Sequence, residues 1–483
     1  MSQLRDAYPL FVGGEWRSGE DGVSAVSIDP STGEEVARVT DGTVGDVAVA
    51  VDAAAAAAPE WAAVPWAERA AALTTLAARI EEDAESFAGL DVVDAGMPIR
   101  GSRRDVANAC TYLRYFAGLA SELKGRSIDV PGTSLDLTVR EPFGVVGRIV
   151  PFNHPLQFAA AAIAAPLAAG NTVVLKPAEQ TPISALHLAE LAAEVLPGGA
   201  VNVVSGGAAA GSALVRHPLV RRIGFTGSIR TGSAVLREAA DQIKVVSLEL
   251  GGKNPLVVLP DVDPEQATEL ATIGMNLQRT AGQSCGSTSR VYLHEEVHDQ
   301  VLERIVERFE QLELGDPRKE TTDVGPLAYA AHAERVRAAI AAARDDGAEL
   351  RTGGPEAPEG TRGGCFVRPT VLAGVEDWMG VARQEIFGPV VSILRWSDEA
   401  DVLARANALE LGLTANVATN DLSAALRFAR GLEAGYVWVN GRGQRPFGAP
   451  FGGWKLSGLG EENSLGELLS YTRTKNVNLS GLA

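Results

Sequence analysis

Cysteine is scarce in this chain of 483 residues, and the spacing of its three copies excludes two common uses. Cys110, Cys285 and Cys365 lie far apart, are odd in number and form no C-x-x-C pair. The sequence therefore predicts neither a disulfide framework nor a zinc site, and we expect no metal. Unpaired cysteines favour a reducing, cytoplasmic setting.

Excess positive charge and long apolar runs are also missing. The formal charge is −18, which argues against a basic surface that coats nucleic acid or docks on a membrane. The longest apolar run, residues 158–169, contains Pro166 and is shorter than the about 20 residues that cross a bilayer. Residues 1–11 lack the cationic start and apolar stretch of a signal peptide. We expect no nucleic-acid partner and no membrane association.

The chain does have a regular alternation of strand-like and helix-like segments. Short apolar runs at 145–150, 172–175, 201–204, 222–225 and 244–248 alternate with predicted helices at 181–196, 211–216 and 229–239. The alternation restarts after Pro255, with strands at 256–259 and 290–293 and helices at 266–277 and 296–311. Such alternation indicates an α/β fold in which helices cover both faces of a parallel sheet.

The ends of the chain carry a different pattern. A hairpin at 10–16 precedes amphipathic helices at 47–58, 68–85 and 106–119. Residues 127–140 alternate between apolar and polar side chains and predict a half-exposed hairpin, which is often an oligomer contact. The tail at 471–479 alternates in the same way and has the pattern to pair with that hairpin.

The stretch with the clearest chemical potential is Thr-Ala-Gly-Gln-Ser-Cys-Gly at 280–286. Small neighbours leave the sulfur of Cys285 open to attack a substrate. A free thiol titrates near ~8.5, so it needs help to react as a thiolate at neutral pH. The alternative is that Cys285 is a small buried hydrophobe, which is how most free cysteines behave.

Two polar residues that each follow a predicted strand are candidate partners for that sulfur. Glu249 ends a strand just before a Gly-Gly turn and is a candidate general base. Asn153 follows an apolar strand, and its amide is a candidate donor to an oxyanion. The alternatives are a solvated loop glutamate and an Asx-type turn before Pro155.

Two further segments suit a dinucleotide, although the sequence has no G-x-G-x-x-G fingerprint. Lys176 and Glu179 end a strand and suit a ribose, and the carboxylate favours NAD because it repels the 2′-phosphate of NADP. Their alternative role is capping of the next helix. Gly227 and Ser228 stand between a strand and a helix start, where pyrophosphate binds.

Together these segments resemble the aldehyde dehydrogenase superfamily over nearly the whole chain. The resemblance rests on the motifs LELGGK, GQSC, EIFGPV and PFGGWKLSG, and on the order Asn, Lys, Glu, Cys along the chain. It implies that Cys285 attacks the aldehyde to form a thiohemiacetal and then a thioester, with Asn153 in the oxyanion hole and Glu249 activating water. It also implies that Glu385, Phe387 and Phe152 lie at the nicotinamide half of bound NAD.

The resemblance implies two doubly wound, Rossmann-like parallel-sheet domains and a small β arm for assembly into a homodimer or homotetramer. Residues 1–122 and 142–250 would bind NAD, and 251–440 would form the catalytic domain that carries Cys285. Residues 123–141 and 466–483 would form the oligomerisation arm, and 441–465 would return to the cofactor domain and the substrate tunnel.

The substrate tunnel is expected to be lined by four polar residues, His154, Gln157, Arg279 and Arg445, and by Phe451. Arg279 resembles the arginine of succinate-semialdehyde dehydrogenases, and His154 resembles the histidine of phosphonoacetaldehyde dehydrogenases. A guanidinium binds carboxylate or phosphonate through two hydrogen bonds, so we predict a small anionic aldehyde as substrate. The alternative is that both arginines pair with Asp or Glu and face away from the tunnel.

Other functions stay open at this point. The enzyme could oxidise neutral aliphatic or aromatic aldehydes, transfer its acyl group to coenzyme A, or be a non-catalytic family member. Glu249 disfavours acyl transfer to coenzyme A, which needs no water-activating carboxylate. The family's frequent second glutamate near the C-terminal segment is replaced by Leu465 in our reading, with Glu461, Glu462 and Glu467 nearby.

Overall fold

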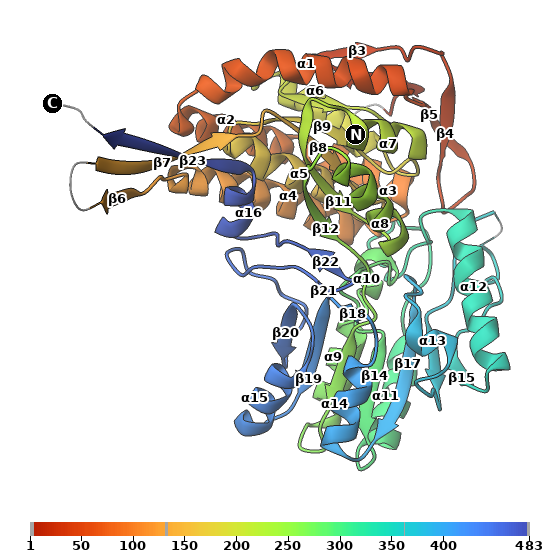
Figure 1. Cartoon of the computed structure of the whole chain (residues 1–483). Coiled ribbons are helices and arrows are strands. Elements are labelled where there is room, and N and C mark those ends of the chain that lie inside the picture. Colours follow the sequence, from red (N-terminus) through yellow and green to blue (C-terminus); the bar gives the residue numbers. More distant parts are fainter. Residues whose placement is uncertain (1–3, 131–133, 362, 481–483) are drawn as a thin grey trace.

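The computed structural model describes residues 4–130, 134–361 and 363–480. Residues 1–3 of the predicted NAD-binding domain, 131–133 of the predicted hairpin and 481–483 of the predicted arm lie outside this part. The chain forms two α/β bodies, one above the other in Figure 1, and a narrow β arm that projects from the upper one. No single helix within the described residues is long and apolar enough to cross a membrane; α1 (Val44–Ala63) and α2 (Trp66–Glu82) meet that test only as a pair bent by 120°.

The first body is built on an eight-stranded sheet. In spatial order its strands are β22 (Gly458–Leu459), β12 (Val245–Glu249), β11 (Val220–Thr226), β8 (Val145–Ile149), β9 (Thr172–Lys176), β10 (Val201–Val203), β2 (Leu10–Val12) and β3 (Glu15–Arg17). The five central strands, β12 to β10, are parallel. The outer strands β22, β2 and β3 are antiparallel to their neighbours.

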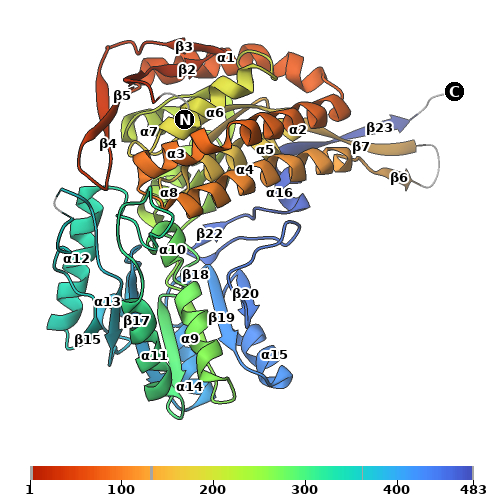
Figure 2. The same cartoon turned by 180° about the vertical axis from the view of Figure 1, so that it is seen from behind.

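Helices cover both faces of this sheet, as the alternating sequence predicted. They are α1 (Val44–Ala63), α2 (Trp66–Glu82), α3 (Ala84–Ala95), α4 (Ile99–Leu119), α5 (Pro155–Ala168), α6 (Ile183–Ala193), α7 (Ala208–Arg216) and α8 (Ile229–Ala240), with the 3-10 turn η1 (Ala120–Glu122) after α4. Successive residues of β9 belong to different cores: Val173 packs with α2 to α6, and Val174 packs with α1, α7 and α8. Figure 2 shows the α2–α4 side. The apolar run at 158–169 forms most of α5 and is a core element.

The second body has a seven-stranded sheet. In spatial order its strands are β15 (Glu349–Thr352), β16 (Thr370–Ala373), β17 (Val390–Trp396), β14 (Arg290–His294), β13 (Pro255–Val258), β19 (Thr414–Ala418) and β20 (Tyr436–Val439). Its helices are α9 (Pro264–Ile273), α10 (Leu277–Thr280), α11 (His298–Glu310), α12 (Ala330–Asp345), α13 (Gly380–Arg383), α14 (Glu399–Asn407) and α15 (Leu422–Gly431). One continuous apolar core runs through this body.

The predicted helix at 266–277 is wrong at its end, because α9 stops at Ile273. Asn276 then takes a left-handed backbone with φ of +54°, and the short α10 follows. Gly274 lies so close to Thr288 that an added Cβ would sit 2.1 Å from its hydroxyl oxygen. Asn tolerates the left-handed region better than most residues, so the break redirects the chain toward the cysteine.

The arm is a three-stranded sheet of β6 (Ser127–Val130), β7 (Ser134–Pro142) and β23 (Thr472–Ser480). The predicted pairing of the tail with the hairpin is confirmed, since β23 lies antiparallel to β7 along its whole length. α16 (Leu465–Ser470) leads into β23. The remaining strands are β1 (Ala7–Tyr8), β4 (Ser24–Ile28) and β5 (Glu35–Thr40) in one small sheet, and β18 (Leu411–Gly412) with β21 (Trp454–Lys455) in another.

Candidate active site

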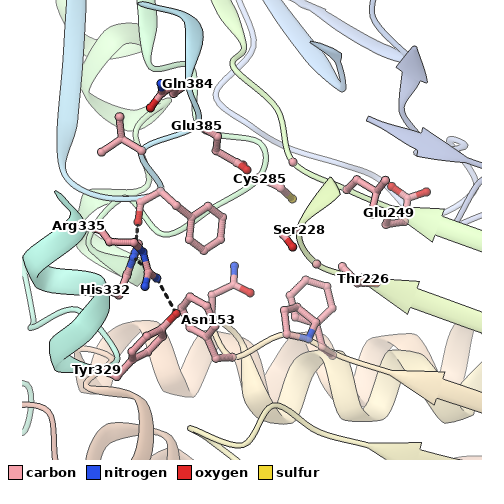
Figure 3. Close-up of a pocket in the computed structure, with 18 of the residues that line it drawn as sticks. Asn153, Thr226, Ser228, Glu249, Cys285, Tyr329, His332, Arg335, Gln384 and Glu385 are labelled. Carbon is pink, nitrogen blue, oxygen red and sulfur yellow. Dashed lines mark hydrogen bonds between the residues drawn. The ribbon is translucent and has the colours of Figure 1, made fainter. Parts of the chain in front are cut away.

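A cleft of about 350 Å³ opens at the carboxyl ends of β8 and β11. The order of the parallel strands reverses between these two, and open α/β sheets bind ligands at such a switch point. Eight of the predicted site residues line the cleft together: Phe152, Asn153, Gly227, Ser228, Glu249, Cys285, Glu385 and Phe387. Figure 3 shows Cys285, Asn153 and Glu249 around the same space, although they come from different elements.

Cys285 is held by its backbone in a tightly packed segment. The Asn254 side chain donates to the Cys285 carbonyl oxygen at 2.7 Å and to the Ser287 carbonyl at 2.9 Å. Gly282 has φ of +78°, and an added Cβ would lie 2.3 Å from the Gly388 carbonyl oxygen. The glycine in GQSC therefore lets the cysteine segment pack against the EIFGPV loop.

The thiol of Cys285 is poorly ionised in this environment. Burial raises its pKa to about 11, although the charge of Arg445 works in the opposite direction. At neutral pH the sulfur is therefore protonated in the cofactor-free protein. Attack on a carbonyl requires a base or an added positive charge nearby.

Asn153 is buried, and its side-chain nitrogen donates to the Gln283 carbonyl oxygen at 2.7 Å. The amide has a second N–H, and its oxygen is buried without a partner. This side chain does not close a local turn before Pro155; it bridges from the end of β8 to the residue two positions before Cys285. Its position fits a donor to an oxyanion formed at a substrate bound to the sulfur.

Glu249 is not a solvated loop residue, since it is only 6 % exposed. Both carboxyl oxygens are buried without a hydrogen-bond partner. Burial raises the pKa of Glu249 well above its ordinary value, and the carboxylates of Glu462 and Glu467 add to the shift. A carboxyl group with free oxygens and a raised pKa suits a general base that works near neutral pH.

That Leu465 replaces the family's second glutamate stays a prediction, and other carboxylates act on Glu249 in the structure. Leu465 begins α16 and is 37 % exposed. The carboxylates that act on Glu249 are those of Glu462 and Glu467, and burial also raises the pKa of Glu467. Sequence spacing could not tell which side chains turn inward from this loop.

Glu385 faces the two glycines that follow Glu249. Its carboxylate accepts a hydrogen bond from the Gly252 amide at 3.1 Å. A Cβ on Gly251 would lie 2.0 Å from a Glu385 carboxyl oxygen, so the glycines of LELGGK make room for this residue. Burial raises the pKa of Glu385 to about 7, partly offset by the nearby Lys253 ammonium.

Three residues of the cleft were missed by sequence reasoning: Tyr329, His332 and Arg335, at the start of α12. His332 Nε2 is 2.7 Å from the carbonyl oxygen of Phe387, a residue with φ of +58°. Arg335 donates to His332 Nδ1 at 3.3 Å and to the Tyr329 hydroxyl at 2.8 Å (Figure 3). Burial lowers the pKa of His332 to about 4, so the imidazole is neutral. Its hydrogen bond to the Phe387 carbonyl holds the left-handed backbone of that residue in place. No sequence motif marked this segment.

Lys176 and Glu179 lie outside the cleft. Lys176 Nζ donates to the Pro177 carbonyl at 3.0 Å, and burial lowers the pKa of this ammonium to about 8 against the pull of Glu179. Glu179 is exposed and borders a neighbouring cavity of about 540 Å³, which shares Tyr329 with the cleft. Neither residue caps α6, because the Ile183 amide in its first turn donates to Asp94, so the alternative interpretation as a cap is wrong.

Gly227 and Ser228 join β11 to α8 at the edge of the cleft. The Gly227 amide donates to the Glu249 carbonyl at 3.0 Å, which ties the end of β11 to β12. Ser228 is the N-cap of α8 and accepts from the Thr231 amide. The N-terminus of this twelve-residue helix therefore faces the cleft, where its dipole suits an anionic group.

A third and smaller cavity, of about 40 Å³, lies beside the cysteine segment. Ser284, Gly286, His154, Arg279 and Arg445 all line it. Two of the predicted tunnel residues contribute indirectly. The oxygen of Gln157 accepts from Arg279 at 2.6 Å, and the ring of Phe451 lies 4.4 Å from the Arg445 guanidinium carbon.

Known proteins resemble this chain over nearly its whole length. The sequence profile of the aldehyde dehydrogenase family matches residues 16–477. The aldehyde dehydrogenase tropH of Talaromyces stipitatus is 42 % identical over 98 % of this chain and 93 % of its own length. Hydroxyisobutyraldehyde dehydrogenase of Mycolicibacterium austroafricanum is 42 % identical over 99 % and 95 %. A betaine aldehyde dehydrogenase of Vibrio vulnificus is 39 % identical over 97 % and 96 %.

Solved structures agree with these matches. An aldehyde dehydrogenase of Bacillus cereus in complex with NAD⁺ superimposes with a TM-score of 0.96 at 38 % identity, covering 99 % of this chain and 97 % of its own. An NADP-dependent enzyme of E. coli superimposes with a TM-score of 0.95 at 35 % identity, covering 99 % and 100 %. Solved structures of this fold thus include both an NAD⁺ complex and an NADP-dependent enzyme.

Proposed function

Because this chain belongs to the aldehyde dehydrogenase family, we propose that it oxidises a small aldehyde to the carboxylic acid with NAD through a thioester on Cys285. The observation that carries the proposal is the meeting of three groups in one cleft. A thiol, an amide donor and a buried carboxyl with free oxygens come from β8, β12 and the segment after α10. Each supplies one function that the reaction needs.

The first half of the reaction forms the covalent intermediate. The Cys285 thiol gives its proton to solvent and the sulfur attacks the aldehyde carbon, giving a thiohemiacetal whose oxygen carries negative charge. The free N–H of Asn153 stabilises that oxygen. When NAD is bound, its nicotinamide supplies the hydride acceptor. Loss of hydride from the thiohemiacetal carbon leaves a thioester.

The second half releases the acid. Glu249 takes a proton from a water molecule, which attacks the thioester carbon, and the thiol is the leaving group. One aldehyde, one NAD⁺ and one water thus become one carboxylic acid, one NADH and one proton. The free oxygens of Glu249 favour this outcome over acyl transfer to coenzyme A.

The residues of the cleft fit a nicotinamide nucleotide. The α8 N-terminus suits pyrophosphate, and Glu385, which accepts from the Gly252 amide, suits a ribose hydroxyl. Outside the cleft, Glu179 lies near Lys176 and suits the other ribose. We expect NAD rather than NADP, because the Glu179 carboxylate repels a 2′-phosphate. The kcat/KM with each cofactor tests this, and Glu179→Gln is expected to narrow the difference. An equal kcat/KM for both cofactors in the parent would overturn it.

The substrate proposal is a small anionic aldehyde whose charge is met by Arg445. Arg279 is already paired with the buried carboxylate of Asp105. Arg445 forms no ion pair or hydrogen bond within the described residues, is half-buried, and lines the small cavity beside the cysteine. A half-buried guanidinium without a counter-ion favours an anionic ligand and disfavours a cationic one.

Steady-state kinetics on succinic semialdehyde, phosphonoacetaldehyde, benzaldehyde and hexanal test this proposal. We expect the anionic pair to have the higher kcat/KM and Arg445→Met to lower it for that pair alone. The matched control is Arg442→Met on the same loop, since Arg442 is exposed and bound to Glu269. If the neutral aldehydes win and Arg445→Met changes nothing, the substrate is neutral.

The function itself is tested by an NADH absorbance assay with Cys285→Ala. We expect that variant to lose aldehyde-dependent NADH formation by at least about 10³-fold while it stays folded. A parent protein that reduces no NAD with any aldehyde would support the non-catalytic alternative.

We also propose that the arm joins subunits into a homodimer or homotetramer. The arm projects from the body, and apolar side chains on it, Ile128, Leu135 and Val139, are 39–46 % exposed. An apolar β surface of this kind is commonly covered by another subunit. Light scattering of Val139→Glu beside the parent tests this; a parent monomer would end the proposal.

A further inference from the structure

The residue that follows Asn153 belongs to a buried hydrogen-bonded chain. The side chain of Asp105 has no exposed surface, and its two oxygens are used by different partners. One oxygen accepts from Arg279, with Nε at 2.8 Å. The other lies 2.6 Å from His154 Nδ1. Although burial opposes it, His154 and Arg279 hold the pKa of Asp105 below its ordinary value, so this carboxylate is ionised.

The hydrogen bonds from Arg279 through Asp105 to His154 determine the protonation state of the imidazole. An ionised carboxylate is only an acceptor, so His154 Nδ1 carries the proton and Nε2 carries the lone pair. Arg279 already balances the negative charge of Asp105, and a second positive charge on His154 is not required there. Burial lowers the pKa of His154, and the nearby guanidinium of Arg279 adds to this against the pull of Asp105. His154 is therefore a neutral acceptor and not a cationic anchor.

The free nitrogen borders the space where the acyl chain of a substrate would lie. Nε2 makes no hydrogen bond within the described part of the chain, and it is not sealed from solvent. His154 lines the 40 Å³ cavity with Ser284 and Gly286, which flank the cysteine. The cavity wall thus contains an unused acceptor on the residue that follows Asn153, together with the two residues that flank Cys285.

We propose that His154 Nε2 accepts a hydrogen bond from a hydroxyl group on the aldehyde, so that the enzyme selects short hydroxy-aldehydes. The inference rests on the proposed aldehyde oxidation and is independent of the anion assigned to Arg445. A substrate without a donor displaces water from Nε2 when it fills the cavity, and this acceptor is then left without a partner. The unpaired acceptor raises the free energy of binding of the plain aldehyde by more than one ordinary hydrogen bond contributes.

The size of the cavity limits the chain length. A space of about 40 Å³ holds the equivalent of two or three water molecules. It fits two or three non-hydrogen atoms beyond the carbonyl group, and a longer or aromatic chain requires the walls to move. The hydroxyl group would sit one or two carbons from the carbonyl.

The test compares pairs of aldehydes that differ only in the hydroxyl: glycolaldehyde with acetaldehyde, and lactaldehyde with propanal. The kcat/KM is measured for each on the concentration of free, unhydrated aldehyde. We expect the parent to prefer the hydroxylated member by about 10-fold or more, and His154→Phe to reduce that ratio to about 1. His154→Gln, which offers an amide oxygen, is expected to keep part of the preference.

Three comparisons keep the outcomes distinct. NAD-independent alkylation of Cys285 by iodoacetamide checks that each variant keeps a formed site. In Arg445→Met the hydroxyl preference is expected to persist, since the two residues recognise different groups. A parent that oxidises both members of each pair equally, or a preference that survives in His154→Phe, overturns this inference alone. No oxidation of any aldehyde, with or without a hydroxyl, overturns the proposed function instead.

Discussion

Replacing Glu249 by Gln tests whether this residue acts only in thioester hydrolysis and not in formation of the thioester. Neither carboxyl oxygen of Glu249 makes a hydrogen bond within the described residues, so the isosteric amide breaks no contact there. The two nearby carboxylates are engaged elsewhere: Glu462 accepts from Arg148, and Glu467 accepts from the Asn463 amide. Neither is free to act as a substitute base.

The magnitude follows from this arrangement. A positioned general base contributes about 10²–10⁴-fold, so thioester hydrolysis in Glu249→Gln should slow by that factor. Formation of the thioester needs Cys285 and Asn153 but not the water-activating base. Rapid mixing with NAD and aldehyde should therefore give a burst of about one NADH per Cys285, followed by a slow steady state.

Two results would contradict this reasoning. If the burst is lost together with the steady state, Glu249 acts first on the Cys285 thiol and not on water. If the steady-state rate is unchanged, Glu249 is not the base at all. The parent enzyme measured in the same buffer, and Cys285→Ala as the variant without a nucleophile, are the controls.

The same variant makes a prediction about stability. The pKa of Glu249 is raised in the folded protein, so folding favours the protonated carboxyl. Stability from this group is present at low pH and is lost as pH rises through the raised pKa. Glutamine does not ionise, so the melting temperature of Glu249→Gln relative to the parent should increase with pH. If the difference in melting temperature stays constant or falls as pH rises, the pKa of Glu249 is not raised in the folded protein.

Three more predictions follow from the site. Arg279→Met leaves Asp105 buried without its guanidinium, and urea unfolding should show a loss of about 3 kcal/mol; a loss below about 1 kcal/mol would contradict the burial of this pair. His332→Ala removes the hydrogen bond to the Phe387 carbonyl, so KM for NAD should rise about 10-fold while iodoacetamide alkylation of Cys285 stays unchanged. A change in alkylation with no change in KM would refute the role of His332 in holding the Phe387 turn. Because the pKa of Cys285 is about 11, its alkylation in the cofactor-free enzyme should be about 10²-fold slower at pH 7.5 than alkylation of a free thiol. The alkylation rate should then rise about tenfold per pH unit up to pH 10. A plateau of this rate near pH 8 would mean that burial does not suppress the thiolate.

The local patterns of the chain predicted much of the fold. Alternation of β-branched runs with amphipathic segments predicted the parallel strands, and the tail paired with the hairpin as its alternation indicated. The helix before the cysteine was predicted too long, because the contact between Gly274 and Thr288 that ends it joins segments 14 residues apart in sequence. Short-range periodicity carries no information about such a contact.

The motifs with Cys285, Glu249 and Asn153 could be recognised in the sequence alone, and so could the glycines where backbones meet closely. The pairing and burial of the residues around them became known only from the folded chain. It showed that Arg279 is bound to Asp105 while Arg445 is not, and that His332 belongs to the cleft. The physical reason is that charge pairing and burial depend on which residues meet in space, and residues 174 positions apart, such as Asp105 and Arg279, meet only when the two bodies pack together.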